Sequence, residues 1–375
     1  MLLPAVVLRG QTQWLRRPLA FVPADSVQLL SYIGPDYRRM VLSRDSSVTA
    51  PVFAITPEME RRRDEIATLC RQLTEHLNIV GGGDDERTVP QGLPARMGIA
   101  ANAYMLLLTG RASHADIIER ALLNASVQTA GRSSLPFRQR DRHASFESLL
   151  ALPGLMYAQQ GDDLYVNLYT NSMARIHLPA ASFSLDQITL MPVDGTVKLR
   201  FSRLAAPTRI RLHLRIPDWV CALLPQPLPF AYARAPQPMP RIFVSGHELY
   251  DVTTEGGYVV IDRTWQSLDE VYLTFPIVPQ LVRRTQGDRA VRGEVAVQVG
   301  PLVYAAQSLP ADCYFSANAP LAFTGAESEA GYPVLRGQVF LPAPADAEAD
   351  SIGFIAVPFC EQTDGVGTVW LPECR

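Results

Sequence analysis

The sequence has few cysteines, and a long stretch has none at all. Its 375 residues contain five cysteines, and no cysteine lies between Cys70 and Cys221. The five are far apart, odd in number and form no C-x-x-C pair. Disulfide frameworks and zinc knuckles need cysteines at close, regular spacing, so neither is indicated. We therefore expect reduced thiols and no bound cofactor.

An excess of positive charge and a long apolar run at the N-terminus are also lacking. The formal net charge is −3 and the six histidines are scattered, which gives no footprint for nucleic acid and no polybasic membrane anchor. The apolar residues before Arg9 are too few for a signal peptide or a membrane span. We expect a cytoplasmic protein that binds neither nucleic acids nor membranes.

The composition is that of a globular chain, with 47% hydrophobic and 19% charged residues. Single cores usually stop growing near 250 to 300 residues, so two or three domains are expected. Residues 1–55 contain several prolines between short apolar runs, which predicts an irregular or strand-like segment. We can assign that segment no function.

Residues 56–158 have helical signals. Thr56 is suited to cap a helix whose first residue is Pro57, and apolar residues then recur at helical spacing until the glycines at 81–83. Further helices are predicted at 96–108, from Ser113 onward, and at 144–157.

From Asp163 onward the apolar period changes to two. Leu164, Val166 and Leu168 alternate with Tyr165, Asn167 and Tyr169, and a similar alternation covers 209–216. Each pattern predicts a strand with one solvent-facing side. Further strands are expected at 197–201, 258–262, 271–275 and 294–299, with turn signals between them. The fold class is therefore α+β and multidomain, with a β-sandwich at 159–305 and a C-terminal β region at 306–375.

Several strings in this β region resemble those of glycoside hydrolase family 127, which includes β-L-arabinofuranosidases. They occur in the expected order and are Asp163–Tyr169 (DLYVNLY), Arg215–Trp219 (RIPDW), Gly257–Ile261 (GYVVI), Gly300–Tyr304 (GPLVY) and Ile355–Phe359 (IAVPF). Upstream, Ile79–Gly82 and Ala115–Asn124 resemble a glycine turn and a helix lining the family's twelve-helix (α/α) toroid. The resemblance implies a partial toroid, with four helices instead of twelve, followed by antiparallel β-sandwich domains.

The resemblance also implies a catalytic centre that this sequence cannot build. Family members use a cysteine thiolate as nucleophile, a glutamate as acid and base, and zinc held by cysteines and a glutamate. The cysteines come from an E-x-C element, which falls near Gln91–Leu93 here, and from a cysteine pair, which falls near Arg140–His143. Neither place has a cysteine, so the thiolate–zinc centre is missing and no metal site is expected.

Two carboxylates are candidate catalytic remnants of the family site. Glu86 follows the glycine turn where the acid/base glutamate would lie, and Glu119 stands on the helix that lines the toroid. The alternative for Glu86 is a solvated loop residue, and for Glu119 an exposed carboxylate paired with a neighbouring base. Tyr165, Asn167 and Tyr169 are candidate ligand-binding residues that would stack on a sugar, or else an interdomain surface.

Three hypotheses for function follow. The first is a non-catalytic relative that acts as a binding or assembly component through its β-sandwich and an uncovered helical face, in a homo- or hetero-oligomer and with carbohydrate as a possible ligand. The second is an active glycoside hydrolase that uses a non-standard carboxylate site. The third is a decayed fragment without independent function. Whether the protein is an enzyme stays open at this point.

Overall fold

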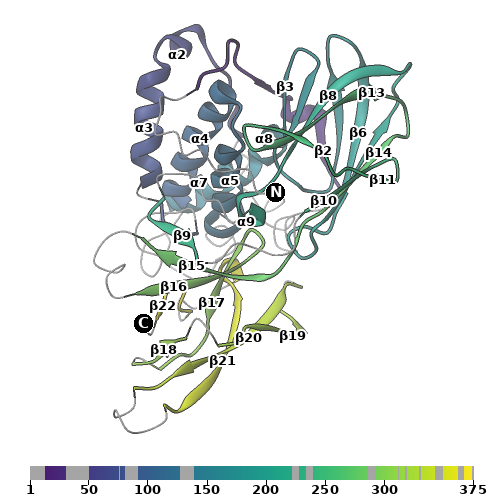
Figure 1. Cartoon of the computed structure of the whole chain (residues 1–375). Coiled ribbons are helices and arrows are strands. Elements are labelled where there is room, and N and C mark those ends of the chain that lie inside the picture. The colour runs from purple at the N-terminus through teal and green to yellow at the C-terminus, as the bar shows by residue number, and fades with distance from the viewer. Residues whose placement is uncertain are drawn as a thin grey trace.

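The structure is a computed structural model. It describes residues 13–30, 50–75, 77–80, 92–126, 139–221, 228–233, 240–285, 293–310, 312–316, 319–328, 331–342, 349–361 and 367–373. Helices gather on one side, a β-sandwich lies beside them, and a third sheet lies below both (Figure 1). This is the predicted α+β multidomain architecture. Glu86 lies outside the described residues.

The helical part follows the predicted segments closely. Its helices are α2 (Pro57–Arg61), α3 (Arg63–Glu75), α4 (Gly92–Thr109), α5 (Ala112–Arg120), α7 (Gln139–Leu150) and α8 (Leu152–Leu155), and a π-helical stretch, Ala121–Ser126, continues α5. Thr56 caps α2 as expected, since its Oγ1 accepts a hydrogen bond from the Met59 N–H at 3.2 Å. Helix α4 contacts α3, α5 and α7, so it forms the centre of this part.

Two sheets form the sandwich. Sheet A has the strand order β1 (Ala20–Phe21), β3 (Tyr157–Gln160), β4 (Asp163–Val166), β8 (Thr208–Arg215), β13 (Tyr258–Trp265) and β12 (Thr253–Glu255). Sheet B has the order β11 (His247–Glu248), β10 (Arg241–Val244), β14 (Glu270–Thr274), β7 (Thr196–Ser202), β6 (Ser182–Thr189), β5 (Ser172–His177) and β2 (Val27–Leu29). Only the β4–β8 pair is parallel among the described ladders of these two sheets.

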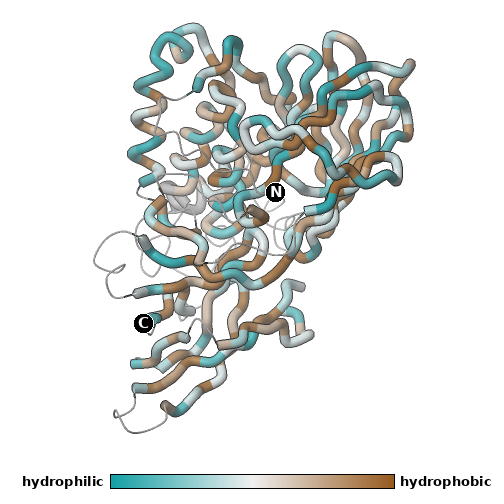
Figure 2. Tube along the Cα trace, viewed as in Figure 1, coloured by the Kyte–Doolittle hydropathy of each residue, from teal (hydrophilic) through white to brown (hydrophobic). Residues whose placement is uncertain are grey.

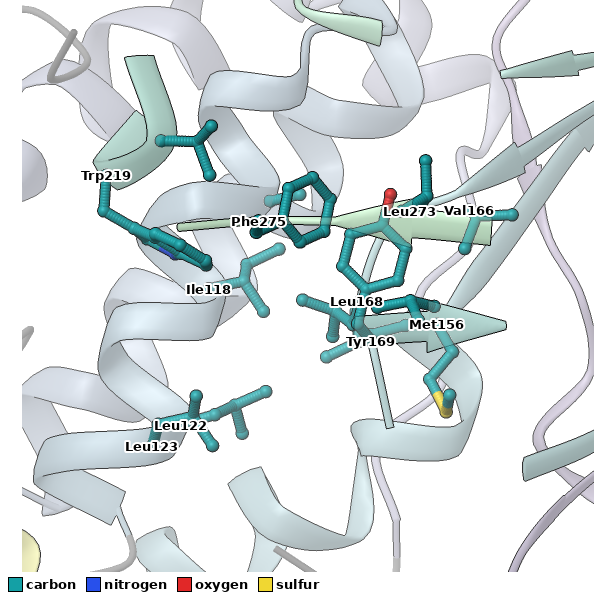
Figure 3. Packing of buried hydrophobic residues seen from close by; sticks show 14 of the residues in the cluster. Ile118, Leu122, Leu123, Met156, Val166, Leu168, Tyr169, Trp219, Leu273 and Phe275 are labelled. Atoms are coloured by element: carbon teal, nitrogen blue, oxygen red, sulfur yellow. The ribbon is translucent and has the colours of Figure 1, made fainter. Parts of the chain in front are cut away.

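The sandwich interior is apolar and includes stacked aromatic rings. The ring of Phe201 in sheet B stacks on Trp265 in sheet A at 4.5 Å between centroids. Hydrophilic and hydrophobic residues alternate along many strands, as expected for sheets with one buried face (Figure 2). The same core continues to the helices, where Ile118 and Leu122 lie opposite Leu168 and Tyr169 (Figure 3). The helices and the sandwich therefore share one core.

Sheet C collects most of the remaining strands. Its order is β18 (Tyr314–Phe315), β20 (Pro333–Phe340), β21 (Ser351–Pro358), β17 (Leu302–Ala306), β16 (Glu294–Val299), β15 (Pro279–Arg284) and β9 (Phe230–Tyr232), while β19 (Ala322–Glu327) pairs with β20 and β22 (Leu371–Pro372) with β16. The boundary predicted at 305/306 falls inside β17, which is bonded to β16 and β21. In the structure, β15 to β17 therefore belong with the C-terminal strands.

The predicted solvent-facing side is wrong for the first strand and half wrong for the second. Tyr165, Asn167 and Tyr169 are 7%, 0% and 5% exposed. Of the predicted outward residues of β8, Arg209 and Arg211 reach solvent, whereas His213 and Arg215 are buried. The helical part covers this end of sheet A, where Leu107 and Ala112 pack against Tyr165 and Tyr258. The period of two indicates which side chains share a face of the strand, but it does not indicate which face is covered by other parts of the chain.

Candidate functional site

A buried network of charged residues joins the helices to both β parts. On α5, Asp116, Glu119 and Arg120 lie at positions i, i+3 and i+4, which places them on one face of the helix. They meet Arg215 at the end of β8 and Asp218 in the short helix α9 (Asp218–Cys221). All five side chains are buried. Such charges persist in a protein interior only when they are paired and hydrogen-bonded.

Arg215 is the first cation of the network and is 0% exposed. Its guanidinium contacts the Asp116 carboxyl at 2.5 Å and donates from two nitrogens to Glu119. Its Nε donates to the Asn167 carbonyl at 2.5 Å. The Tyr169 ring lies 5.7 Å from the guanidinium carbon, and the Tyr169 hydroxyl donates to the Arg215 carbonyl at 2.6 Å. Arg215 thus ties α5 to sheet A.

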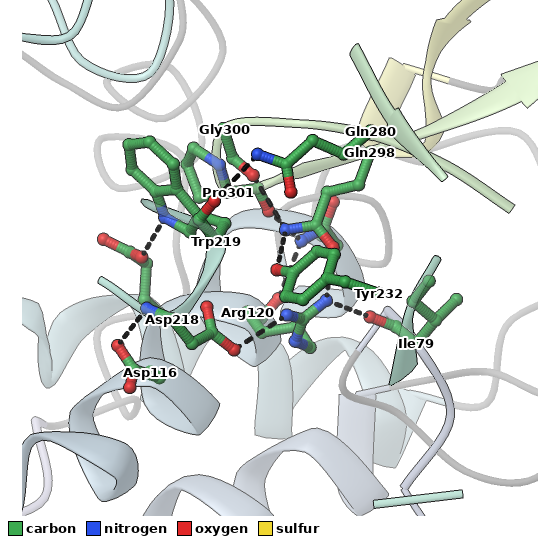
Figure 4. A network of polar contacts seen from close by, with 12 residues as sticks. Ile79, Asp116, Arg120, Asp218, Trp219, Tyr232, Gln280, Gln298, Gly300 and Pro301 are labelled. Atoms are coloured by element: carbon green, nitrogen blue, oxygen red, sulfur yellow. Dashed lines mark hydrogen bonds and ion pairs between the residues drawn. The ribbon is translucent and has the colours of Figure 1, made fainter. Parts of the chain in front are cut away.

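Arg120 is the second cation and reaches sheet C (Figure 4). It donates to Asp218 Oδ2 at 3.2 Å, to the Ile79 carbonyl at 3.2 Å and to Gln298 Oε1 at 3.0 Å. Gln298 in turn donates to the Tyr232 hydroxyl at 3.0 Å. Arg120 therefore connects α5 with α9, with Ile79 in the stretch that follows α3, and, through Gln298, with strands β16 and β9.

Trp219 and its neighbour Asp218 close the network on the α9 side. The Trp219 Nε1–H donates to Glu119 Oε2 at 3.2 Å, and the Trp219 carbonyl accepts from Gln280 at 2.8 Å. The Asp218 N–H donates to Asp116 Oδ1 at 3.3 Å. These bonds fix the first turn of α9 against α5 (Figure 4).

The network contains three carboxyl groups and two guanidinium groups, so one carboxyl lacks a full counter-ion. Glu119 takes two donor nitrogens of Arg215, and Asp218 is paired with Arg120. Burial, and next the charge of Asp218, raise the pKa of Asp116 well above its usual value. Burial also raises the pKa of Asp218, against the effect of Arg120. Both shifts favour the protonated forms of Asp116 and Asp218.

Glu119 is the one predicted catalytic residue that the structure describes. It is 5% exposed and bonded to Arg215 and Trp219, so the alternative of an exposed helical carboxylate is wrong. A cavity of about 20 Å³ lies beside it, lined by residues that include Leu122, Leu168 and Tyr169. That volume is enough for roughly one water molecule and far too small for a sugar.

The predicted ligand-binding residues are not accessible either. Tyr165 stacks on His213 at 4.0 Å, Asn167 accepts from the Tyr258 hydroxyl at 2.8 Å, and Tyr169 lies against Arg215. All three are buried between the helices and sheet A. A sugar ring cannot stack on them in this structure. They occupy the interdomain surface that was the alternative expectation.

The residues present do not fit the zinc of family 127. Cys70, the cysteine nearest to the expected elements in sequence, donates from its thiol to Asn102 Oδ1 at 3.6 Å, and burial raises its pKa to about 11. Its thiol is therefore protonated at neutral pH and is a poor metal ligand. Within the described ranges, no three His, Cys, Asp or Glu side chains converge on a point that would hold a metal ion.

The described part of the chain is a helical layer packed on a β-sandwich, with a further sheet behind and a buried polar junction between them. Comparisons of the sequence and the structure with known proteins relate this fold to one family. Residues 163–277 match the sequence model of the middle domain of GH127 β-L-arabinofuranosidase. This match covers β4 to β14 and α9 and confirms the predicted resemblance to family 127.

Solved structures of family 127 have the same fold. A GH127 β-arabinofuranosidase superposes with a TM-score of 0.69 at 23% identity, over 80% of this chain and 54% of the other. A GH127 β-L-arabinofuranosidase from Geobacillus stearothermophilus T6 gives 0.67 at 24% identity, over 84% and 58%. A third structure, a glycoside hydrolase, gives 0.62 at 20% identity, over 77% and 53%. The chain spans little more than half the length of these proteins. No curated protein matches.

Among the described helices, none is long and apolar enough to cross a membrane.

Sequence analysis missed the network although two signals for it were present. The string Ala115–Asn124 places three ionisable residues on one face of an otherwise apolar helix. The string Arg215–Trp219 supplies three further members, Arg215, Asp218 and Trp219. Ionisable residues inside apolar patterns are the sequence mark of buried pairing.

Proposed function

We propose that this chain is a cytoplasmic, non-catalytic relative of the family 127 enzymes that acts as a binding or assembly component. One observation carries the proposal. Glu119 and Asp116, the described carboxyl groups on the helix that resembles the toroid lining, are bonded to Arg215 in a space that admits no sugar. A catalytic acid or nucleophile must reach the substrate, and these groups do not.

The missing thiolate supports the same proposal. The family mechanism needs a cysteine made nucleophilic by a metal, and residues 71–220 contain no cysteine. Free thiols at Cys70, Cys221 and Cys313 agree with a reducing compartment. These features favour a retained scaffold whose chemistry has been lost.

The proposal is tested by an assay for turnover. Purified protein is incubated with aryl β-L-arabinofuranoside and with related pyranosides, with and without added zinc. We expect no release of the aryl group above the rate without protein. Release that is abolished by Glu119→Gln, in a variant that keeps the unfolding midpoint of the parent, would refute the non-catalytic role.

An active hydrolase with a non-standard carboxylate site is the second candidate, and the raised pKa of Asp116 favours it. A carboxyl group that keeps its proton at neutral pH is suited to act as a general acid. This candidate requires α5 to separate from β8 so that Asp116 meets substrate. It predicts turnover that Asp116→Asn removes, whereas the first proposal predicts no turnover in either protein.

For the assembly role we propose a second copy of the chain as partner. Exposed apolar side chains on and beside the helical part support it, because Val52 is 85%, Leu69 55% and Met97 44% exposed. Light scattering and native mass spectrometry of tag-free protein are expected to give a mass above that of the single 41.3 kDa chain. A strict monomer without bound protein would rule out self-assembly.

A further inference from the structure

The outer face of sheet B carries a row of side chains that crosses five strands. Residues directly opposite one another on neighbouring strands are, in order, Glu248 on β11, Phe243 on β10, Tyr272 on β14, Lys198 on β7 and Ile188 on β6. We call this set the aromatic row. It runs across sheet B on the side of the molecule away from α3 and α4 (Figure 1).

Alternation along the strands shows that the row faces outward. The flanking residues Ile242, Val244 and Leu273 are buried in the sandwich core. Phe243, Tyr272 and Lys198 are half-buried, and Ile188 is 50% exposed. Next to the row, Tyr250 is 86% exposed and its hydroxyl donates to Glu248 Oε2 at 2.9 Å. Three aromatic rings thus contribute to one solvent-facing surface.

Charged groups border the rings and are matched in pairs. Arg241 binds Glu248 through two nitrogens, at 2.7 and 2.8 Å, and lies 4.9 Å from the centre of the Phe243 ring. Lys198 pairs with Glu270 at 2.6 Å and lies 5.1 Å from the centre of the Tyr272 ring.

These two cations and two carboxylates balance one another, so the four groups together carry no net charge. A nucleic acid or a strongly charged peptide finds no electrostatic attraction on such a surface.

Rings and matched charges together suit one kind of ligand. Sugar rings have apolar C–H faces that pack on aromatic rings, and hydroxyl groups that both donate and accept hydrogen bonds. Lys198 and Glu248 in the row, with Arg241 and Glu270 beside it, supply both donors and acceptors. The surface is extended over five strands, which favours a chain of sugars over a single one. We infer that the aromatic row and Tyr250 form a docking surface for a neutral polysaccharide.

This inference rests on the binding role proposed above and names its ligand class and its place. It is independent of the helical face proposed for self-assembly, since the row lies on sheet B. Tyr250, at 86% exposed, brings little burial energy to the fold, and the half-buried Phe243 and Tyr272 bring only part of what full burial would give. Their concentration on one sheet face is explained by a ligand that covers them.

Native gel electrophoresis with polysaccharide in the gel tests the inference. The full chain is run in gels that contain arabinan, arabinoxylan, galactomannan or mixed-linkage β-glucan, and in a gel that contains polygalacturonate. We expect the protein to migrate more slowly in at least one gel with a neutral polysaccharide than in a gel without polysaccharide. In the polygalacturonate gel we expect no such retardation. Tyr250→Ala and Tyr272→Ala are each expected to weaken the association constant about tenfold, the effect of losing one aromatic stacking contact.

Two further variants separate ligand contact from loss of fold. Tyr272→Phe keeps the ring and is expected to keep the retardation. Phe323→Ala removes an aromatic side chain that is 39% exposed on β19, away from the row, and is expected to migrate like the parent.

Equal retardation of the parent, Tyr250→Ala and Tyr272→Ala would refute this surface while leaving the binding role intact. Absence of retardation in every neutral gel would refute a polysaccharide as the ligand. The assembly role would then be decided separately by the mass of the native protein.

Discussion

Replacing Arg215 with methionine removes the cation between α5 and sheet A while keeping a long apolar side chain. The change strands the carboxylate of Glu119 in a position that is 5% exposed, together with Asp116, which is 6% exposed. Removing one partner of a buried ion pair costs about 3–5 kcal/mol, because the remaining charge keeps its desolvation penalty. We expect Arg215→Met to lose stability in this range.

Guanidinium unfolding followed by tryptophan fluorescence measures the loss, since Trp219, one of the four tryptophans of the chain, donates to Glu119. With slopes of roughly 2–6 kcal/mol per molar denaturant, the midpoint should fall by about 0.5 M or more. Arg209→Met is the matched control. It changes the same residue type on the same strand, but its side chain is 74% exposed and paired with Asp262. No change of midpoint is expected there.

A second substitution tests the stated cause. If stranded charge produces the loss, adding Glu119→Gln to Arg215→Met should restore part of the stability, with a coupling of about 0.5–3 kcal/mol. An Arg215→Met midpoint equal to that of Arg209→Met, or a double variant that shows simple additivity, would refute the account of the network.

Three other predictions concern single residues. Asp116 holds its proton more tightly in the folded chain than at its unfolded pKa of 3.8, so stability should fall as the pH rises from about 4 toward the raised pKa. Asp116→Asn should reduce this decline, as seen by thermal unfolding at a series of pH values, and Asp218, whose pKa is also raised, should account for the rest. A Cβ at Gly195 would lie 1.9 Å from the Phe275 carbonyl oxygen, so Gly195→Ala should cost about 1–3 kcal/mol in a denaturant titration, while Gly353→Ala, with open space at its Cβ, should not. The Cys70 thiol, with its pKa raised to about 11, should react with iodoacetamide at pH 8 at least about tenfold more slowly in the native chain than after unfolding, and equal rates by mass spectrometry would contradict its burial.

Much of the fold could be predicted from local signals. The cap at Thr56, the helical spacing after it and the period of two after Asp163 each depend on neighbours in sequence, and the structure has helices and strands at those places. The strand predicted at 294–299 coincides with β16. Such elements are set by the chain itself.

The candidate site could not be predicted in the same way. The series Arg209, Arg211, His213 and Arg215 has a single period, yet its first half is solvated and its second half is buried. The difference arises where α4 and α5 pack on sheet A, and this packing joins segments about a hundred residues apart. The sequence pattern around Glu119 fits an exposed helical carboxylate as well as a buried one, because its partner Arg215 lies on β8. Only tertiary packing brings these charges together.

The hydrogen bond between Arg120 and Gln298 also limits how early the chain can finish folding during its synthesis. The two residues are 178 positions apart, and the strand that carries Gln298 is made long after α5 has left the ribosome. At about 5–20 residues per second, the wait is roughly 9–36 s. During that interval the guanidinium of Arg120 lacks its Gln298 partner, and the contact between the helices and sheet C is incomplete. A nascent chain halted before residue 298 should therefore remain bound to chaperones and sensitive to proteases, however well its helices form.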